Sequence, residues 1–573
     1  EASFAQGWND PAVALSLALI AHADIPQWML KPKSYEDAVH PDNLLRDKWI
    51  AGMVGELQGK MNNGRDGFAR TVPDSEPRRN GRRPVKVKWV FDTKYTIDGE
   101  VREHKARLVM CGYEQIEGVD YGETFASTIR GVTVRAFFAM AAKFKLKLAL
   151  GDVVKAFTQA EADRDIYGEM PKGFEMPGYV LLFKQSLEGA KQAAHLWQNL
   201  LSDVLVKELG FTRSIIDPCL YTRGTRGELN DDRMIVIVWV DDLAIAYSNE
   251  AKMDTFIERI QKHLKCTFEK GLNKYIGMEV TRDIDRGTIT LTQTNYITKL
   301  FNRHMAASNA KGWKHMTPCG TSRPEATKFL EIKPTENEYE RAENIKRGFL
   351  VLIGGIMYAM VFTRPDIAFH TSHLASCMQS PSTEAYEAAL NLLRYMYHTK
   401  HMGITFGNID PERTKMVGIQ KSEPFVWADA SFGGREFSPY GGGYVECHYG
   451  PLGWIARRLK FKPLSTFEAE VAALVVMLKE GMFSVEILKE MGFKIMFPVS
   501  AATDSKSAYD AIKNAGVTKN SVHFERWLHY ARDLAMRNRV SVILVGTDVQ
   551  MADDKTKVVD KRKFLACRRA QKS

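Results

Sequence analysis

The amino-acid sequence predicts a protein of several domains that combines α/β and α+β organisation. Its 573 residues are enough for roughly three to four domains of ordinary size. From Val85 onward, short β-branched runs alternate with amphipathic helical runs, which is typical of sheets covered by helices. After Pro424 the rhythm changes to three closely spaced strands followed by a long helix, which predicts a separate C-terminal domain.

The composition narrows the class of protein. A hydrophobic content of 45% and a charged content of 26% are ordinary for globular chains. The net charge of +10 and the pI near 9.0 favour a polyanionic partner. The seven cysteines include no Cys-x-x-Cys pair, which argues against a zinc site or a disulfide framework and fits a reducing compartment. Because the chain begins at Glu1 rather than Met, we expect a fragment or a processed product.

The first part of the chain carries no recognisable chemistry. The apolar stretch Ala12–Ala23 is too short to span a bilayer and predicts a buried helix. Residues 73–84 are basic and rich in turn-forming residues, and we interpret them as a solvated linker. A nuclear-localisation or phosphate-binding patch is the alternative for this segment.

The later elements follow from periodicity and turn residues. Val85–Tyr95 and Val101–Gly112 are expected to form two strands joined by a hairpin turn at Asp98-Gly99. Val132–Phe144 is an apolar helix, and Leu146–Val154 is a strand that carries Asp152. The elements expected after these are helix Ala190–Leu209, hairpin 234–247, helix Ala251–Leu264, a polar linker over 313–340, helices over 341–362, 382–399 and 467–489, and strands over 425–432, 441–449, 452–461, 495–503 and 540–545.

Two adjacent carboxylates, Asp241 and Asp242, interrupt the apolar run 234–247, whose β-branched flanks predict buried strands. Burying unpaired carboxylates is costly, and placing like charges side by side costs more, whereas a divalent cation removes both penalties. The pair is therefore a candidate metal site at the tip of a hydrophobic hairpin. An Asp-rich hairpin turn that binds no metal is the alternative.

Three further features indicate nucleotide chemistry. Asp152 adds a third strand-end carboxylate, which completes the set that two-metal phosphoryl transfer requires. Lys105 and Arg107 lie two residues apart on a strand and therefore on one face, where such a pair suits a triphosphate. A solvent-facing basic edge strand is the alternative for that pair. Phe157 follows Asp152 by five residues, and we expect it to pack beneath the incoming sugar.

Eight short motifs occur in a fixed order along the chain. They are Lys88-Trp-Val-Phe91, Lys105-Ala-Arg-Leu-Val109, Tyr121-Gly-Glu-Thr-Phe-Ala126, Asp152-Val-x-x-Ala-Phe157, Lys191-Gln-Ala193, Val240-Asp-Asp242, Tyr275-Ile-Gly-Met-Glu-Val280 and Thr363-Arg-Pro-Asp-Ile-Ala368. In this order they resemble the reverse transcriptases of copia-type (Pseudoviridae-like) LTR retrotransposons. Three positions depart from that pattern: Trp239 replaces the usual Tyr, Ala194 replaces Pro, and one segment reads Leu187-Glu-Gly-Ala-Lys-Gln192. None of these changes removes a metal ligand.

The resemblance implies a right-hand polymerase with fingers, palm and thumb, a connection, and a C-terminal ribonuclease H-like α/β domain. The implied domains are an N-terminal extension and basic linker over 1–80, fingers and palm over 81–290, thumb and connection over 291–420, and ribonuclease H over 421–573. The resemblance assigns Asp152, Asp241 and Asp242 to Mg²⁺, and Lys105 and Arg107 to the triphosphate. It makes Phe157 the gate against a 2′-hydroxyl and places Gln192 near the nucleotide and template.

Four carboxylates stand at element boundaries in the C-terminal domain, namely Asp429, Glu468, Asp504 and Asp553. Each has a structural alternative, because a strand end, a capping box with Ser465 or a helix cap would use these same residue types. Together, their order resembles that of a ribonuclease H, in which all four would be catalytic Mg²⁺ ligands. The comparison favours Glu468 over Glu470, and Asp553 over Asp554.

The activity implied by the resemblance is RNA-directed DNA polymerisation by two-metal nucleotidyl transfer, with ribonuclease H cleavage of the RNA strand of RNA–DNA hybrids. It implies two Mg²⁺ ions per active site, for which Mn²⁺ can substitute. The expected partners are an RNA template, a DNA primer, the RNA–DNA hybrid and dNTPs, with integrase or a second copy of the chain as further candidates and no membrane. The expected location is a cytoplasmic virus-like particle, with the nucleus as the alternative. The alternative function is a host-adopted, catalytically idle relative with an RNA-binding or structural role.

Overall fold

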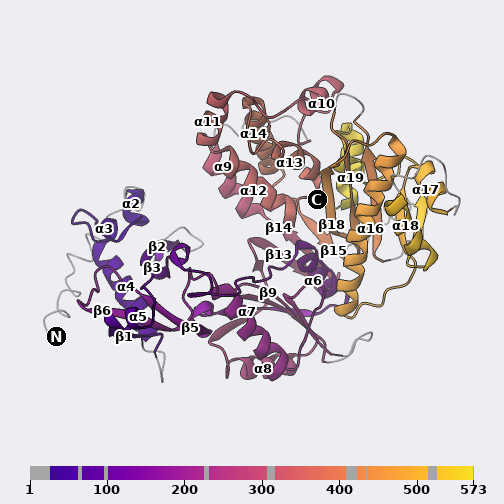
Figure 1. Ribbon diagram of the computed structural model, residues 1–573. Helices are drawn as coiled ribbons and strands as arrows, with labels where there is room; N and C mark the ends of the chain where they lie inside the picture. Colours follow the sequence, from indigo (N-terminus) through magenta and orange to yellow (C-terminus); the bar gives the residue numbers. More distant parts are fainter. Residues whose placement is uncertain are drawn as a thin grey trace. The chain divides into compact units, whose positions relative to one another are not determined.

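The computed structural model describes residues 26–61, 67–95, 101–224, 232–305, 317–407, 423–433, 437–513 and 525–571, and the chain divides into two compact units (Figure 1). The first unit contains Glu1–Ser127, Val153–Glu208 and His263–Lys265. The second contains Thr128–Asp152, Leu209–Lys262 and Cys266–Ser573. The expected helix Ala12–Ala23 and the turn at Asp98-Gly99 lie outside the described residues.

The first unit is built on a β-hairpin and a small antiparallel sheet. Strands β2 (Val87–Tyr95) and β3 (Val101–Met110) form the predicted hairpin, and helix α4 (Arg46–Met61) packs on it through the buried ring of Trp49. The sheet has the order β1-β6-β5. Its strands and the other helices of this unit are β1 (Ala69–Pro73), β5 (Glu161–Gly168), β6 (Tyr179–Gln185), α2 (Gln27–Leu30), α3 (Tyr35–Ala38), α5 (Ser75–Arg79), the 3₁₀ turn η4 (Ala156–Gln159) and α7 (Ala193–Asp203).

The segment 73–84 is more ordered than the predicted solvated linker. Helix α5 lies inside it, and Pro77 is buried. Arg82 donates to the carbonyl oxygen of Asp165, and Arg83 donates to that of Glu114 at 2.9 Å. Because backbone carbonyls hold these guanidinium groups, the segment is tied to the first unit, although most of its residues are exposed as predicted.

The second unit begins with a six-stranded sheet of order β11-β4-β10-β9-β8-β7. Its central strands β9 (Met234–Trp239) and β10 (Asp242–Tyr247) are almost continuously buried, as the apolar run predicted. The remaining strands and the helices beside them are β4 (Lys147–Val153), β7 (Thr212–Arg213), β8 (Leu220–Arg223), β11 (Cys266–Lys270), α6 (Gly131–Lys143) and α8 (Glu250–Ile260).

A helical region and a second sheet follow in the same unit. The sheet has the order β12-β13-β14-β15, with β12 (Lys274–Tyr275), β13 (Met278–Asp283), β14 (Thr288–Thr292) and β15 (Ile404–Phe406). The helices are α9 (Thr294–His304), α10 (Arg323–Leu330), α11 (Glu338–Lys346), α12 (Phe349–Phe362), α13 (Ala368–Ala375) and α14 (Thr383–His398). Helix α10 lies within the predicted linker 313–340, because Ser322 and Glu325 form a capping box and Phe329 is buried.

Within the described residues, a helix of membrane-spanning length and apolarity is not found. Helices α11 and α12, bent by 60° at the break between them, meet that test only when taken together and only by length and composition.

The C-terminal domain has the predicted order of elements. Its sheet is β18-β17-β16-β19-β20, antiparallel from β18 to β16 and parallel from β16 to β20. The strands and helices are β16 (Phe425–Ser431), β17 (Tyr440–Cys447), β18 (Gly450–Arg458), α16 (Thr466–Glu490), β19 (Val499–Thr503), α17 (Lys506–Lys513), α18 (Glu525–Met536), β20 (Val540–Leu544), the 3₁₀ turn η9 (Asp553–Lys555) and α19 (Lys561–Gln571). The predicted combination of α/β and α+β domains is confirmed.

Helix α6 joins this domain to the rest of the second unit. It packs against β18 and α16. Arg135 on α6 is buried, donates to the carbonyl oxygens of Leu452 and Phe362, and lies over the ring of Trp454 at 4.0 Å. The C-terminal domain is thus docked on a buried face of α6.

Candidate active sites

The first candidate site lies at the turn between β9 and β10. Trp239 pairs with Asp242 across the hairpin, so Val240 and Asp241 form a two-residue turn. Val240 has a φ of +58°, which is rare for a β-branched residue and is usually taken by glycine in such turns. Its side chain is 41% exposed. A hairpin turn and a metal site were alternative interpretations of the sequence. They are compatible, because Asp241 lies in the turn and Asp242 directly follows it.

The third carboxylate lies beside this turn. In the antiparallel pairing of β10 with β4, Asp242 is directly opposite Asp152. Burial raises the pKa of Asp242 to about 6, and the charges of Asp241 and Asp152 add to the rise. Like charges opposite one another destabilise a sheet. A cation between these carboxylates would remove that cost, and the three residue types suit a divalent metal, although their ligand atoms do not all lie within 4.8 Å of one another.

Two aromatic rings support the hairpin. Tyr275 is fully buried, with its hydroxyl 3.5 Å from the carbonyl oxygen of Ile237. The ring of Trp239 packs edge-on against Phe362 of α12 at a centroid distance of 6.3 Å. The indole that replaces the usual Tyr therefore ties the hairpin to α12.

The first unit carries the residues predicted to bind the nucleotide. Lys105 and Arg107 lie half-buried on the same face of β3, as their spacing predicted. Lys105 lines a hollow of about 680 Å³ together with Lys48, Arg102 and Lys155. Burial lowers the pKa of Lys105, and Arg107 lowers it further. Glu56 and Glu103 also line this hollow, so its four cations outnumber its carboxylates by two, and that balance suits a polyanionic ligand.

Two other predicted residues of this unit are less accessible. Phe157 lies in η4 and packs partly buried against a core that includes Phe183 and Leu187. Gln192 is only 1% exposed, and its amide donates to the carbonyl oxygen of Asp120 at 2.9 Å. In the structure, Gln192 therefore stabilises the loop that contains Asp120. Its proximity to the nucleotide stays a prediction.

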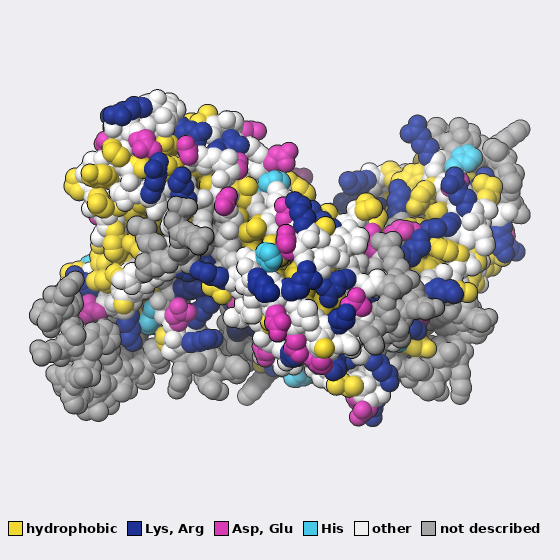
Figure 2. All heavy atoms as spheres, turned by 90° about the horizontal axis from the view of Figure 1, so that it is seen from below, with side chains coloured by type: hydrophobic (Ala, Val, Ile, Leu, Met, Phe, Trp, Pro, Cys, Tyr) yellow, Lys and Arg dark blue, Asp and Glu magenta, His cyan; other side chains and the backbone are white. Residues whose placement is uncertain are grey.

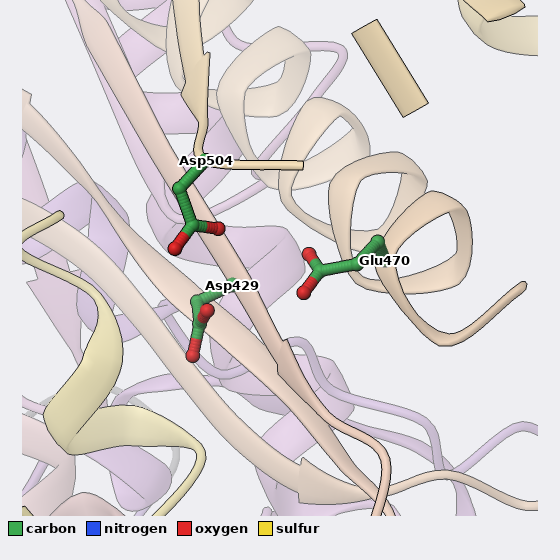
Figure 3. Close-up of side chains that lie close together, drawn as sticks. All are labelled: Asp429, Glu470 and Asp504. Carbon is green, nitrogen blue, oxygen red and sulfur yellow. The ribbon is translucent and has the colours of Figure 1, made fainter. Parts of the chain in front are cut away.

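The second candidate site lies in the C-terminal domain. Asp429 on β16, Glu470 on α16 and Asp504 at the end of β19 turn their carboxylates toward one another (Figure 3). Their ligand atoms all lie within 4.8 Å, and in the described parts of the chain no other group of three or more Asp, Glu, His or Cys side chains meets that criterion. Burial raises the pKa of Asp429 to about 7, with Asp553 and Asp504 adding to the rise and Lys557 opposing it. Burial also raises the pKa of Glu470, as do Asp429 and Asp504. This crowding fits a divalent cation.

The helix glutamate of this cluster is Glu470, not the predicted Glu468. Glu468 accepts a hydrogen bond from the backbone of Leu464 at 2.6 Å, and its own N–H donates to Ser465 at 3.3 Å. Residues two apart on a helix do not share a face, so only one of the two glutamates can reach the cluster. The capping box visible in the sequence was the signal that separates them.

Asp553 and Asp554 have different surroundings. Asp553 faces Asp429 across Lys557, whose ammonium lies 2.5 Å from Asp553 Oδ1 and 3.6 Å from Asp429 Oδ2. Asp554 instead pairs with the buried Lys555 at 2.6 Å and accepts from Gln571. The structure therefore brings Asp553 beside the site, and Asp554 belongs to the packing of α19. Lys557 is not among the site residues that the sequence predicted.

Comparison with known proteins supports the resemblance. Residues 75–318 match the family described as reverse transcriptase (RNA-dependent DNA polymerase). The chain is 29% identical, over 94% of its length, to 38% of the retrovirus-related Pol polyprotein from transposon TNT 1-94 of Nicotiana tabacum. It is 26% identical, over 84% of its length, to 31% of the Pol polyprotein from transposon RE1 of Arabidopsis thaliana. It is also 28% identical, over 56% of its length, to 96% of the putative transposon Ty5-1 protein YCL074W of Saccharomyces cerevisiae.

Among solved structures, the foamy viral protease-reverse transcriptase in complex with dsDNA has a TM-score of 0.40 and 12% identity, covering 80% of this chain and 77% of that one. The same viral protein in complex with RNA/DNA hybrid has a TM-score of 0.39 and 11% identity, covering 81% and 50%. The chain spans less than two fifths of the Pol polyproteins from the two plant transposons.

Proposed function

We propose that this chain copies RNA into DNA and cleaves the RNA strand of the resulting hybrid. The proposal is supported by its similarity over most of its length to Pol polyproteins of copia-like transposons, and by the match of residues 75–318 to the reverse transcriptase family. One observation carries the polymerase proposal: Asp152 lies directly opposite Asp242 at the turn that presents Asp241. Like charges opposite each other destabilise a sheet, so the placement of these carboxylates favours a bound cation.

The proposed polymerisation is a nucleotidyl transfer. The 3′-hydroxyl oxygen of the primer bonds to the α-phosphorus of a dNTP, the bond to the pyrophosphate oxygen breaks, and the hydroxyl proton leaves to solvent. Mg²⁺ ions held by Asp152, Asp241 and Asp242 would activate the hydroxyl and neutralise the leaving pyrophosphate. Lys105 and Arg107 are proposed to bind the triphosphate.

Nucleic-acid binding by the second unit is supported by a groove between α9 and α12. This hollow of about 470 Å³ is lined by Lys299 and Arg303, the rings of Tyr296 and Tyr358, and Gly354. Cations suit phosphates, the rings suit bases or sugars, and a glycine lets a backbone approach closely. Figure 2 shows that Lys and Arg side chains alternate with Asp and Glu over the face seen from below, so the net charge of +10 is not gathered there in one patch.

The proposed second activity is hydrolysis. A water oxygen bonds to a phosphorus of the RNA strand, the bond to one sugar oxygen breaks, and a water proton ends on that leaving oxygen. A divalent cation held by Asp429, Glu470 and Asp504 would activate the water and stabilise the phosphate. Both activities together would place the chain in the cytoplasmic particle where a transposon RNA is copied.

A primer-extension assay tests the proposal. The unmodified chain is expected to extend a DNA primer on an RNA template with Mg²⁺. The variant Asp241→Asn should lose extension by about 10³-fold or more and retain RNA cleavage, because removing a ligand of the reacting cation removes its electrostatic stabilisation. Asp429→Asn, the matched control, should lose cleavage and retain extension.

Absence of extension by the unmodified chain, with cleavage intact, would overturn the polymerase proposal. Absence of both activities in a folded chain would favour the catalytically idle relative instead. Loss of both activities in either single variant would contradict two separate sites.

A further inference from the structure

Helix α4 carries a buried carboxylate, Glu56, between two lysines. Its Oε1 lies 2.9 Å from the ammonium of Lys60, and its Oε2 lies 2.9 Å from that of Lys155. The Glu56 side chain is 6% exposed and that of Lys155 is 27% exposed, so water screens this pair weakly. Although burial favours the neutral acid, Lys60 and Lys155 hold the pKa of Glu56 below its ordinary value. Glu56 is therefore ionised at neutral pH and holds both lysines.

Lys60 extends this pair into a row of alternating charges. Its side chain is 1% exposed, and its ammonium lies 3.1 Å from Glu188 Oε2 and donates to the carbonyl oxygen of Leu108 at 3.3 Å. Lys155, Glu56, Lys60 and Glu188 are thus connected in that order, and all four belong to the first unit. Glu188 lies in the segment 187–192 that departs from the family pattern, so this departure supplies a charge partner for a buried lysine.

The turn that Lys155 forms leads directly to Phe157. Lys155 has a φ of +51°, a left-handed conformation that is uncommon for residues other than glycine and has to be held by its surroundings. Its carbonyl oxygen accepts hydrogen bonds from the N–H of Thr158 at 3.0 Å and from the Thr158 hydroxyl at 2.9 Å. Phe157 lies in η4 and packs against the core that contains Leu187, the neighbour of Glu188. The two ends of the charge row therefore lie in the two segments that fix Phe157.

Gly59 leaves room for the pair of Glu56 with Lys155. It lies on α4, and a Cβ atom added there would be 2.9 Å from Lys155 Nζ, well inside ordinary van der Waals contact. An ammonium at the end of a flexible side chain can move away, and alanine favours a helix more than glycine does. Alanine at position 59 would therefore displace one ammonium without removing a charge or weakening the helix.

We infer that Glu56 is a positioning residue of the proposed polymerase: by holding Lys155 it fixes the turn that presents Phe157, and so sets the discrimination between deoxyribonucleotides and ribonucleotides. This inference rests on the proposed polymerase activity and on the predicted gate role of Phe157. It gives α4, which lies outside the matched residues 75–318, a part in nucleotide selection. A row that served stability alone would change the melting temperature and leave the selectivity unaltered.

Primer extension with dNTPs and with rNTPs measures this discrimination as a ratio of kcat/KM values. Gly59→Ala should lower the ratio about tenfold, since a misplacement of about 1 Å can cost up to about 10²-fold in rate. Its melting temperature should stay the same or rise. Lys155→Met should lower the ratio similarly, whereas Lys155→Arg keeps a cation within reach of Glu56 and should retain most of the discrimination.

A direct contact of Lys155 with the triphosphate would give a different result. Deoxyribonucleotides and ribonucleotides share the triphosphate and differ at the 2′ carbon, so the loss of such a contact would raise KM for both and leave the ratio unchanged. The ratio therefore separates a role of Lys155 in holding the turn from a role in binding phosphate.

Hydrogen–deuterium exchange of the full chain gives a readout that needs no activity. In Gly59→Ala the amide of Thr158, which donates to Lys155, should exchange faster than in the unmodified chain. Glu56→Gln should behave like Gly59→Ala in exchange and ratio, but with a lower melting temperature because the buried Lys60 loses one of its two carboxylates. Gln58→Ala, at an exposed position of the same helix, is the matched control and should change neither readout.

An unchanged ratio in Gly59→Ala and Lys155→Met, with the unmodified chain active, would overturn the inference and leave the charge row a purely structural role. Failure of the proposed function is recognised separately. The unmodified chain would then extend no primer, although the exchange at Thr158 would still rise in Gly59→Ala.

Discussion

The carboxyl group of Asp242 lies among like charges, and this has a consequence for stability. Its ordinary pKa is near 4, and in the folded chain burial, Asp241 and Asp152 raise that pKa to about 6. The folded state therefore binds a proton more tightly than the unfolded state. By linkage, the metal-free chain loses stability as the pH rises from about 4 to about 6, and the loss persists at higher pH.

We predict that Asp242→Asn removes this penalty. In EDTA at pH 7.5 the variant should melt at a higher temperature than the unmodified chain, by an amount equivalent to about 1–2 kcal/mol after allowance for partial exposure. At pH 4 the two should melt alike. Mg²⁺ should raise the melting temperature of the unmodified chain at pH 7.5 more than that of the variant.

Scanning calorimetry at the two pH values, with and without Mg²⁺, checks this prediction. A lower melting temperature for Asp242→Asn in EDTA at pH 7.5 would contradict it, because Asp242 would then be stabilised by its neighbours.

The position of a side chain was predictable from the sequence where it depends only on neighbouring residues of the same strand or turn. The alternation of β3 placed Lys105 and Arg107 on one face, and the apolar run placed Asp242 at a buried strand end. The choice of Glu468 over Glu470 was wrong: the spacing from Ser465 indicated a capping role for Glu468, and the glutamate that meets Asp429 is set by which side of α16 faces β16. The burial of Gln192 depends on the loop that contains Asp120, far from it in sequence.

At the scale of elements, a buried ion pair explains the motif Thr363-Arg-Pro-Asp-Ile-Ala368. Arg364 donates through two nitrogens to the two carboxylate oxygens of Asp366, at 2.8 and 2.7 Å, and both side chains are fully buried. Tyr395 on α14 donates to Asp366 at 2.6 Å, and Arg568 on α19 donates to Tyr395 at 3.2 Å. Burial favours the neutral acid, but Arg364 and Tyr395 hold the pKa of Asp366 at about 2. The network joins α14 and α19 to this motif.

We predict that Asp366→Asn lowers the free energy of unfolding by about 3–5 kcal/mol, because it leaves the Arg364 charge buried without its partner. The double variant Arg364→Met, Asp366→Leu should be destabilised less than Asp366→Asn, since the Arg364 charge is removed together with its partner. Urea denaturation followed by tryptophan fluorescence measures both. A double variant less stable than the single one would show that the pair is worth more than an apolar replacement.

The network includes α19, a helix whose basic sequence gives little sign of a buried face. The many lysines and arginines of residues 561–572 predict a segment exposed to solvent. The pattern of Phe564, Cys567 and Arg568 nevertheless buries one face of a helix within the part of the tail that is described. A buried face of so few residues is difficult to detect in the sequence, because lysines and arginines surround it. Helix α10 was missed for a similar reason, because one buried ring, Phe329, anchors it.

At the scale of the whole molecule, the C-terminal domain shares its packing with the sheet that carries Asp152 and Asp242. Arg135 on α6 hydrogen-bonds to Leu452 of β18 and to Phe362 of α12, and Trp454 of β18 donates to the carbonyl oxygen of Met360 at 3.0 Å. These contacts cross the domain boundaries at 290 and 420 that were predicted from the sequence. The boundaries stay predictions, although the second unit packs as one body across them.

We predict that removing residues 423–573 destabilises the remaining chain, because the buried face of α6 would be exposed to water. The fragment should be aggregation-prone, and its melting temperature should fall by several degrees at least. Arg135→Met in the full chain is the graded test: it keeps bulk on α6 but leaves backbone carbonyls of Leu452 and Phe362 without that donor. A soluble fragment that extends primers at the full rate would contradict this prediction.

The packing of β18 on α6 has a consequence for shortened copies of the gene. A gene shortened anywhere before the codon for Leu452 would lose the surface that covers α6, and with it the support of the sheet that holds the proposed polymerase carboxylates. Genomic copies shortened in this way are therefore expected to lack both proposed activities at once, rather than to persist as polymerases without a nuclease.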